Sequence, residues 1–211
     1  MDAKASTNRI AERKLRERQA RREQIVSTAR RIAEQEGWSN VTVRRLSDEI
    51  SYSQPVLYGH FGSCEEILAA VAIEGFREIG LALEQARKRA RRGRALELVA
   101  AAYLNFAKSS PALYEVMFSL SLSVPFDEPS TPAELRFAFS PLFELFEGQT
   151  SNPEVMAELF WASLHGIAEL TRTQRFPEGR QQARLKTLVE RFSVAVHRQK
   201  YVVLLKSSQA T

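Results

Sequence analysis

The chain has 211 residues, of which 44% are hydrophobic and 26% charged, and a formal net charge of +5. This apolar content suffices for a packed core and excludes a disordered tail, while no run approaches the roughly 20 apolar residues of a membrane span. One cysteine excludes an internal disulfide, and the charged N-terminus lacks a signal-peptide core, so we expect a reducing cytoplasm.

The positive charge is concentrated at the N-terminal end. Residues 1–62 hold twelve Lys and Arg against eight Asp and Glu, whereas the rest of the chain holds eighteen against seventeen. Residues 1–20 form a basic arm, mobile or a frayed helical extension, which is either a solubilising tail or a contact with DNA. From Arg21 to Glu36 one helix is predicted, ended by Gly37, with a buried stripe of Ile25, Ala29, Ile32 and Ala33. We expect Trp38 at the corner before the next helix.

A helix-turn-helix is predicted over residues 42–61. Thr42 is a suitable N-cap for a short helix that buries Val43, Leu46 and Ile50. Arg44 and Arg45 lie outside, in the first turn, where backbone N–H groups, the helix dipole and two guanidinium groups would together favour a phosphate. A second short helix opens with Pro55 and is anchored by Leu57 and Phe61, so it exposes Gln54, Pro55, Tyr58, Gly59 and His60.

These residues resemble the DNA-binding domain of the tetracycline-repressor family of bacterial transcription regulators. The family's Thr-x-Arg, Leu-Tyr-x-His-Phe and Ser-x-Glu-Glu motifs are matched by Thr42, Arg44, Leu57, Tyr58, His60, Phe61, Ser63, Glu65 and Glu66. The resemblance implies that Thr42, Tyr58 and His60 contact phosphates. It also implies that base edges are met by Arg44 and the start of the third helix, Gln54, Pro55 and Val56. Arg45 and Ser53 complete the predicted DNA-binding set.

The turn departs from the family pattern. Ile50-Ser51-Tyr52-Ser53 stands where the family carries Ala-Gly-Val-Ser, so the glycine is missing. Two positions that the family fills with Lys are Gln54 and Cys64, and Pro55 replaces a small residue.

A long fourth helix is predicted from Ser63, which forms a capping box with Glu66, to about Ala90. It should bury Ile67, Val71, Phe76, Ile79 and Leu83. Cys64 lies in its first turn, where a thiol pKa tends to fall; it is a redox sensor or an inert residue near the cap. The basic residues from Arg87 to Arg94 are either a solvated linker or a second DNA patch.

The remaining chain is predicted to be helical, with no strands. Helix starts are signalled at Ala95, Pro111, Pro132, Pro153 and Glu178. Pro141 should kink or split the pattern that ends at Glu147, and residues 124–132 should form a flexible loop.

This half is rich in aromatic residues, which form either ordinary core or the lining of a ligand cavity. The predicted ligand-binding set is Tyr103, Phe106, Met117, Phe118, Phe139, Phe143, Trp161 and His165. His165 is either structural, orienting a ligand, or a metal ligand, but no second histidine has the spacing of a metal site, so we expect no metal and no cofactor.

Trp161 to Gly166 reads Trp-x-x-x-His-Gly and resembles a C-terminal domain class of the same family. The resemblance implies that the last two helices form a two-fold dimer interface. The final helix carries an apolar stripe that fits such an interface: Leu185, Leu188, Val189, Phe192 and Val196. Burial of this stripe within one protomer would produce the same spacing of apolar residues.

The sequence therefore predicts an all-α regulator with a basic arm (1–20), a helix-turn-helix domain (21–66) and a ligand-binding and dimerisation domain (67–211). A homodimer should bind a double-stranded DNA operator and release it when a small-molecule effector binds, with the fourth helix as the lever. Signatures of enzymes are absent from the sequence, so catalysis is not expected. The alternatives are an enzyme or a non-specific nucleoid or membrane-surface binder, and neither should prefer a DNA sequence.

Overall fold

The computed structural model describes residues 2–91, 93–119 and 131–208, with side chains described between residues 9 and 194 of those ranges. The regular structure in these ranges is helical and includes no strand, which confirms the predicted all-α fold. The chain divides into two compact units. The first comprises Met1–Glu74 with Ala112–Leu122, and the second Gly75–Pro111 with Ser123–Thr211.

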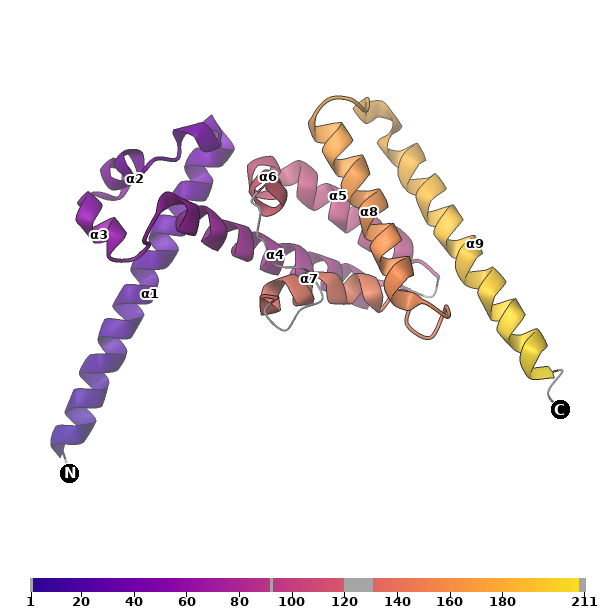
Figure 1. The fold of residues 1–211 in the computed structure, drawn as a ribbon, viewed down its shortest axis with the longest axis horizontal. Helices are drawn as coiled ribbons and strands as arrows, with labels where there is room; N and C mark the ends of the chain where they lie inside the picture. Colours follow the sequence, from indigo (N-terminus) through magenta and orange to yellow (C-terminus); the bar gives the residue numbers. More distant parts are fainter. Residues whose placement is uncertain (1, 92, 120–130, 209–211) are drawn as a thin grey trace. The chain divides into compact units, whose positions relative to one another are not determined.

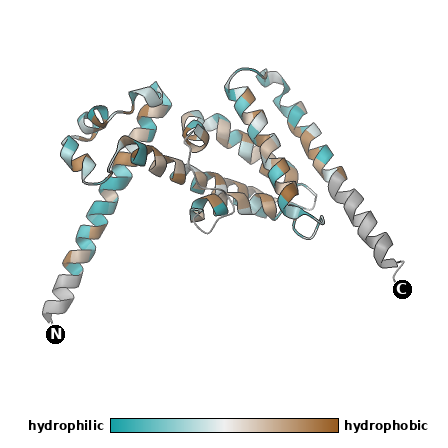
Figure 2. Ribbon diagram, in the orientation of Figure 1, coloured by the Kyte–Doolittle hydropathy of each residue, from teal (hydrophilic) through white to brown (hydrophobic). Residues whose placement is uncertain are grey.

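The first unit is built on α1, Asp2–Glu36 (Figure 1). The helix begins well before Arg21: of the two alternatives for residues 1–20, a mobile arm or a helical extension, the structure has the extension, because the Lys, Arg, Glu, Gln and Ala residues there favour a helix. Residues 9–21 are all exposed, and Figure 2 shows this part as mostly hydrophilic. The predicted stripe is confirmed, since Ile25, Ala29, Ile32 and Ala33 are at most 3% exposed. Gly37 ends the helix with φ 84°, a conformation that glycine adopts without strain.

Two short helices follow: α2, Val43–Ile50, packs on α1, and α3, Gln54–Tyr58, packs on α2. The short 3-10 helix η1, Trp38–Asn40, precedes them. Four of the five predicted anchors of the helix-turn-helix are buried: Leu46, Ile50, Leu57 and Phe61. The fifth, Val43, is the first residue of α2 and is only partly buried.

A later helix, α6 (Pro111–Ser119), also belongs to the first unit. Trp38 lies in η1, at the predicted corner after α1, and its indole Nε1 donates a hydrogen bond to the carbonyl of Ala112 at 2.8 Å. The carboxylate of Glu34 accepts hydrogen bonds from the N–H groups of Ala112 (3.2 Å) and Leu113 (3.0 Å). The acid on α1 therefore satisfies two N–H groups at the start of α6, where a negative charge also suits the helix dipole.

The helix α4, Cys64–Arg89, continues from the first unit into the second. Its predicted cap is confirmed: the N–H of Glu66 bonds to Ser63 Oγ at 3.2 Å, and the Glu66 carboxylate accepts the N–H of Gly62 at 2.8 Å. The predicted stripe is buried along the whole helix: Ile67, Val71, Phe76, Ile79 and Leu83. In the second unit, a Cβ added to Gly80 would lie 2.6 Å from the Phe137 ring, so glycine here permits the close approach of α7, Ala133–Phe143.

The second unit also contains α5 (Ala95–Ser109), α8 (Pro153–Arg172), η2 (Glu178–Arg180) and α9 (Gln181–Ser208). Pro141 divides its region as predicted, since α7 ends two residues later and turns follow. The helices are joined by contacts between tilted rings, with the Phe192 ring of α9 lying 4.9 Å from Phe160, edge-on, and 5.9 Å from Phe146 between centroids.

Part of the sequence prediction lies outside the described residues. This applies to most of the predicted loop at 124–132 and to the side chain of Val196. Within the described ranges, none of the helices is both long and apolar enough to cross a lipid bilayer.

Candidate DNA-binding surface

The first helix of the motif, α2, is capped as predicted. Thr42 Oγ1 accepts a hydrogen bond from the N–H of Arg45 at 3.1 Å, which fixes where the helix begins. Arg44 is exposed, and it makes no hydrogen bond or ion pair with any residue in the described ranges. Its guanidinium group therefore remains available to an external acceptor.

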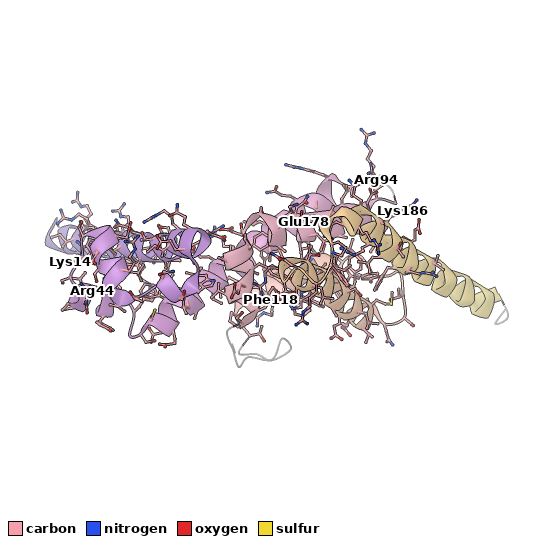
Figure 3. The ribbon with its side chains drawn as sticks, turned by 90° about the horizontal axis from the view of Figure 1, so that it is seen from above. Lys14, Arg44, Arg94, Phe118, Glu178 and Lys186 are labelled. Atoms are coloured by element: carbon pink, nitrogen blue, oxygen red, sulfur yellow. The ribbon has the colours of Figure 1, made fainter. Side chains whose placement is uncertain are left out.

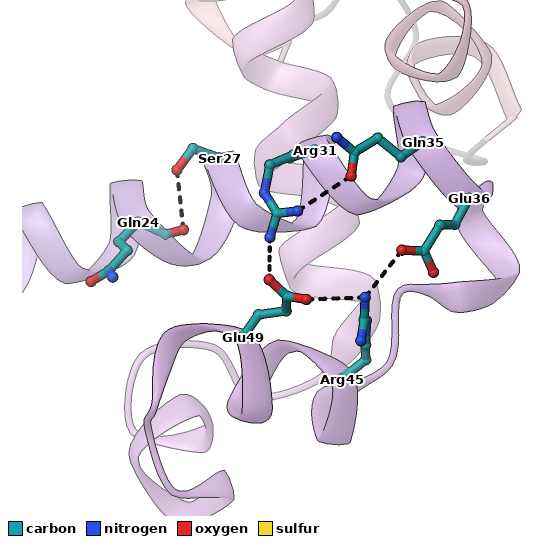
Figure 4. A network of polar contacts seen from close by, with 7 residues as sticks. All are labelled: Gln24, Ser27, Arg31, Gln35, Glu36, Arg45 and Glu49. Carbon is teal, nitrogen blue, oxygen red and sulfur yellow. Dashed lines mark hydrogen bonds and ion pairs between the residues drawn. The ribbon is translucent and has the colours of Figure 1, made fainter.

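Arg45, the neighbouring residue, is part of a polar network between α1 and α2 (Figure 4). Its Nη2 lies 3.1 Å from Glu36 Oε1 and 3.0 Å from Glu49 Oε1. The second oxygen of Glu49 pairs with Arg31 of α1. The structure thus gives Arg45 partners within its own unit, and the two adjacent arginines differ in what they can offer to DNA.

The turn between the two helices takes a glycine-like conformation without a glycine. Ser51 has φ 56° and ψ 37°, in the left-handed region that costs most residues about 1–2 kcal/mol. The N–H groups of Ser51 and Tyr52 both bond to the carbonyl of Ser47. Tyr52 also donates its hydroxyl to Gln24 Oε1 at 2.9 Å, which holds the turn to α1.

The second helix, α3, presents the outward face that the sequence predicts. Leu57 is 1% exposed, whereas Val56 is 38% and Tyr58 53% exposed. Ser53, Gln54, Pro55 and Gly59 are exposed as well, and Ser53 makes no side-chain cap. This helix is too short to be stable alone, so its position depends on Leu57 and on the contacts that follow it.

The end of α3 is held by Arg22 of α1, a residue outside the predicted site. The Arg22 guanidinium lies 3.9 Å above the Phe61 ring and donates a hydrogen bond to the carbonyl of His60. Burial, and then the charges of Arg18, Arg21 and Arg22, lower the pKa of His60 below its ordinary 6.5. His60 Nδ1 is buried with no hydrogen-bond partner among the described residues.

The fold therefore brings Arg18, Arg21 and Arg22 of α1 close to His60, at the end of α3. The sequence predicted a basic arm but not the residues beside it, because Arg22 and His60 are 38 residues apart. Figure 3 shows Lys14 and Arg44 among the many basic side chains of this unit.

The predicted ligand-binding residues are divided between the two units. In the second unit, Trp161 Nε1 donates to the Tyr103 hydroxyl at 3.0 Å, and the Phe139 ring lies 6.2 Å from Trp161. His165 of the same unit is partly buried, and burial lowers its pKa, with Glu169 opposing the shift. Phe106 and Phe143 are also partly buried there. Met117 and Phe118 lie on α6 in the first unit, where Phe118 stacks 4.9 Å from Tyr114.

The structure bears on two questions that the sequence left open: the reactivity of Cys64 and the role of the basic residues from Arg87 to Arg94. The prediction of a lowered thiol pKa at Cys64 is wrong, because burial and the neighbouring Glu65 raise it, so a reactive thiolate is disfavoured. In the basic run that begins in the last turn of α4, Arg87 pairs with Glu144, Lys88 with Glu84 and Arg94 with Glu97. These ion pairs favour a surface linker over a second DNA patch. The residues that the structure describes include no group of acidic, His and Cys side chains placed to hold a metal ion.

Comparison with known proteins places the two halves of the chain in the same family. Residues 25–71 match the sequence profile of bacterial regulatory proteins of the tetR family. Residues 96–192 match the profile of the tetracyclin repressor-like C-terminal domain.

Individual relatives agree with these profiles. The HTH-type transcriptional regulator Rv0681 of Mycobacterium tuberculosis is 30% identical over 155 residues, which cover 72% of this chain and 70% of that protein. Among solved structures, a TetR-family transcriptional regulator of Pectobacterium atrosepticum, ECA1819, is 21% identical with a TM-score of 0.65, covering 87% of this chain and 95% of that one. The structure of RolR in complex with resorcinol is 15% identical with a TM-score of 0.56, covering 83% of this chain and 88% of that one.

Proposed function

Because the chain belongs to the TetR family of DNA-binding transcription regulators, which are not enzymes, we propose that it is a repressor whose homodimer leaves its operator when a small molecule binds. The observation that carries the proposal is the outward face of α3, with Leu57 buried behind it, together with Arg44, which has no partner within the described ranges.

In the proposed complex, α3 enters the major groove and its exposed start meets base edges together with Arg44. Thr42 uses its side-chain oxygen as the cap of α2, but its O–H can still donate to a phosphate. The Tyr58 hydroxyl is exposed and can do the same. The His60 ring is neutral near pH 7 because its pKa is lowered, and its Nε2 is the nitrogen left to donate. Arg45 supports this surface through Glu36 and Glu49.

The basic row on α1 extends the proposed contact along the DNA backbone. Lys14, Arg21 and Arg22 are each three or four residues from Arg18, so the four side chains share one face of the helix. At 1.5 Å per residue the row covers about 12 Å, which adds phosphate contacts beyond the groove. We propose that the arm binds DNA in this way, and that it strengthens binding to all duplexes alike.

The proposed dimer interface is an apolar stripe on α8. Val155 is 49% and Leu159 54% exposed, and Ala162 is exposed on the same face. Further along, a Cβ added to Gly166 would meet nothing within 4 Å, so nothing inside the protomer requires a glycine there. In the proposed dimer, a second copy of α8 would pack on the large residues Val155 and Leu159 and approach closely at the small residues Ala162 and Gly166. Phe192 of the predicted α9 stripe instead packs on Phe146 and Phe160 of its own protomer.

The effector is proposed to act through the aromatic residues predicted for it, around Tyr103, Trp161 and Phe139. RolR binds resorcinol, which supports a small-molecule site in this fold. Two members of the predicted set, Met117 and Phe118, lie on α6, and α6 is tied to α1 through Glu34 and Trp38. Within the first unit, a displacement of α6 would reach α1 through these contacts, while α4, which runs from the first unit into the second, is the proposed lever. Because the two binding equilibria are coupled, operator DNA must weaken effector binding by the same factor.

Selection of bound fragments from a random duplex library tests the DNA-binding part. A near-palindromic site with half-sites about 34 Å apart should be enriched, and its binding should weaken steeply with salt. Recovery of fragments without any common sequence would contradict the proposal and favour a non-specific nucleoid protein.

A further inference from the structure

The second unit contains a cavity of about 250 Å³ between the C-terminal ends of α5 and α8 and the start of α9. Its walls are formed by Leu104, Ala107, Lys108, Pro111, Ala168, Thr171, Arg172, Gln174, Glu178 and Gln181. None of the eight residues predicted to bind a ligand is among them, so this is a different place in the fold from the aromatic cluster.

The cavity has an apolar side and a polar side. Leu104, Ala107 and Ala168 are 6–7% exposed and form apolar wall together with Pro111. The polar side comes from the end of α8 and the segment leading into α9. A ligand that fits both sides must itself be amphipathic.

The cation available to such a ligand is Lys108. Its Nζ lies 3.0 Å from Glu178 Oε2, and these side chains are 71% and 69% exposed. Glu178, labelled in Figure 3, lies where the chain enters α9. So exposed an ion pair contributes little, so another carboxylate can take the place of Glu178 at small cost. Arg172 is less available, because its Nε and Nη2 already donate to the two carboxylate oxygens of Glu169 at 3.0 and 2.8 Å.

A second donor is the side-chain amide of Gln181. Its Oε1 already accepts a hydrogen bond from Arg184 Nη1 at 3.3 Å, whereas the nearby Thr171 hydroxyl donates to the carbonyl of Ile167 at 2.7 Å. With the oxygen so engaged, the amide NH₂ group remains to donate. A lysine and an amide donor above an apolar wall suit a carboxylate attached to a hydrocarbon body.

We propose that this cavity binds a small monocarboxylic acid, with the carboxylate on Lys108 and Gln181 and the hydrocarbon body against Leu104, Ala107 and Ala168. At about 30 Å³ per water molecule, the volume corresponds to roughly eight waters, which suits an acid of about eight to ten non-hydrogen atoms. Binding at this site does not require that the protein bind DNA.

Calorimetric titration of the full chain with hexanoate and with its uncharged analogue hexanamide tests the proposal. Hexanoate should bind about tenfold more tightly than hexanamide, because it alone makes a charge-assisted hydrogen bond. Lys108→Gln should remove that preference. Glu178→Gln should strengthen hexanoate binding several-fold and leave hexanamide unchanged, since it removes the competing carboxylate.

A cavity-filling variant locates the site. Ala168→Leu should abolish binding of both compounds, whereas Ala183→Leu, at an exposed position of α9, should not. The proposal is overturned if hexanoate does not bind, if hexanamide binds equally well, or if Glu178→Gln weakens hexanoate binding. Circular dichroism checks that Ala168→Leu still folds; if it does not, the Lys108 and Glu178 variants, both at exposed positions, decide the outcome.

Discussion

Replacing Arg44 with alanine should lower DNA specificity, whereas replacing Arg45 with alanine should lower stability, although the two residues are adjacent in the first turn of α2. Arg44 is exposed and has no partner among the described residues, so Arg44→Ala should change the free energy of unfolding by less than about 0.5 kcal/mol. Arg45 is paired with Glu36 and Glu49. Arg45→Ala should therefore lower stability.

The magnitudes follow from these contacts. An arginine that reads a base contributes about 1–3 kcal/mol of discrimination, and a dimer uses two copies. Arg44→Ala should therefore reduce the ratio of operator to scrambled-duplex affinity by roughly 30-fold or more. The two ion pairs of Arg45 are partly exposed, with side-chain exposures of 43% for Arg45, 41% for Glu36 and 24% for Glu49. After discounting for solvent screening, their loss should cost about 1 kcal/mol of stability and leave the affinity ratio nearly unchanged.

Fluorescence anisotropy with the selected operator and a scrambled duplex, at several salt concentrations, measures the affinity ratio, and urea denaturation measures stability. Tyr58→Phe serves as a second comparison, because loss of a phosphate contact should weaken both duplexes by the same factor. The assignment of Arg44 to base reading is refuted if Arg44→Ala weakens both duplexes equally. The structural role of Arg45 is refuted if Arg45→Ala relaxes specificity without lowering stability.

Other changes test the turn, the α6 contact, the titration of His60 and the dimer. Ser51→Gly should raise the free energy of unfolding in urea by about 1 kcal/mol, because it relieves the left-handed strain; an unchanged or lower value would contradict that strain. Glu34→Gln should accelerate hydrogen exchange at the amides of Ala112 and Leu113, while Glu36→Gln should not. Burial and three arginines lower the pKa of His60, so the unfolded chain binds more protons, and stability should fall as pH decreases below 6.5. His60→Gln should flatten that dependence, and an unchanged pH profile would remove His60 as its cause. Leu159→Arg should yield a folded monomer in sedimentation analysis, whereas Leu81→Arg, at another exposed leucine, should leave the dimer intact.

The sequence correctly predicted helix caps and apolar stripes, which depend on residues close to one another along the chain. Thr42 and Ser63 cap the helices that they were predicted to cap, and the apolar stripes of α1 and α4 are buried as their spacing indicates. These features depend on residues within a few positions of one another, so periodicity and capping rules apply to them. The sequence left two alternatives open for residues 1–20, because charged residues of high helix propensity are equally typical of a mobile arm and of a helical extension.

The sequence by itself determined the all-α class, the outward residues of α3 and the family, because helical spacing and a short motif are properties of neighbouring residues. The tertiary structure alone decided which of two adjacent arginines is free, which arginines of α1 lie beside His60, and that Glu34 and Trp38 hold α6. The physical reason is that charges, hydrogen bonds and cavities act between atoms close in space, and the residues concerned are separated along the chain by up to 79 positions.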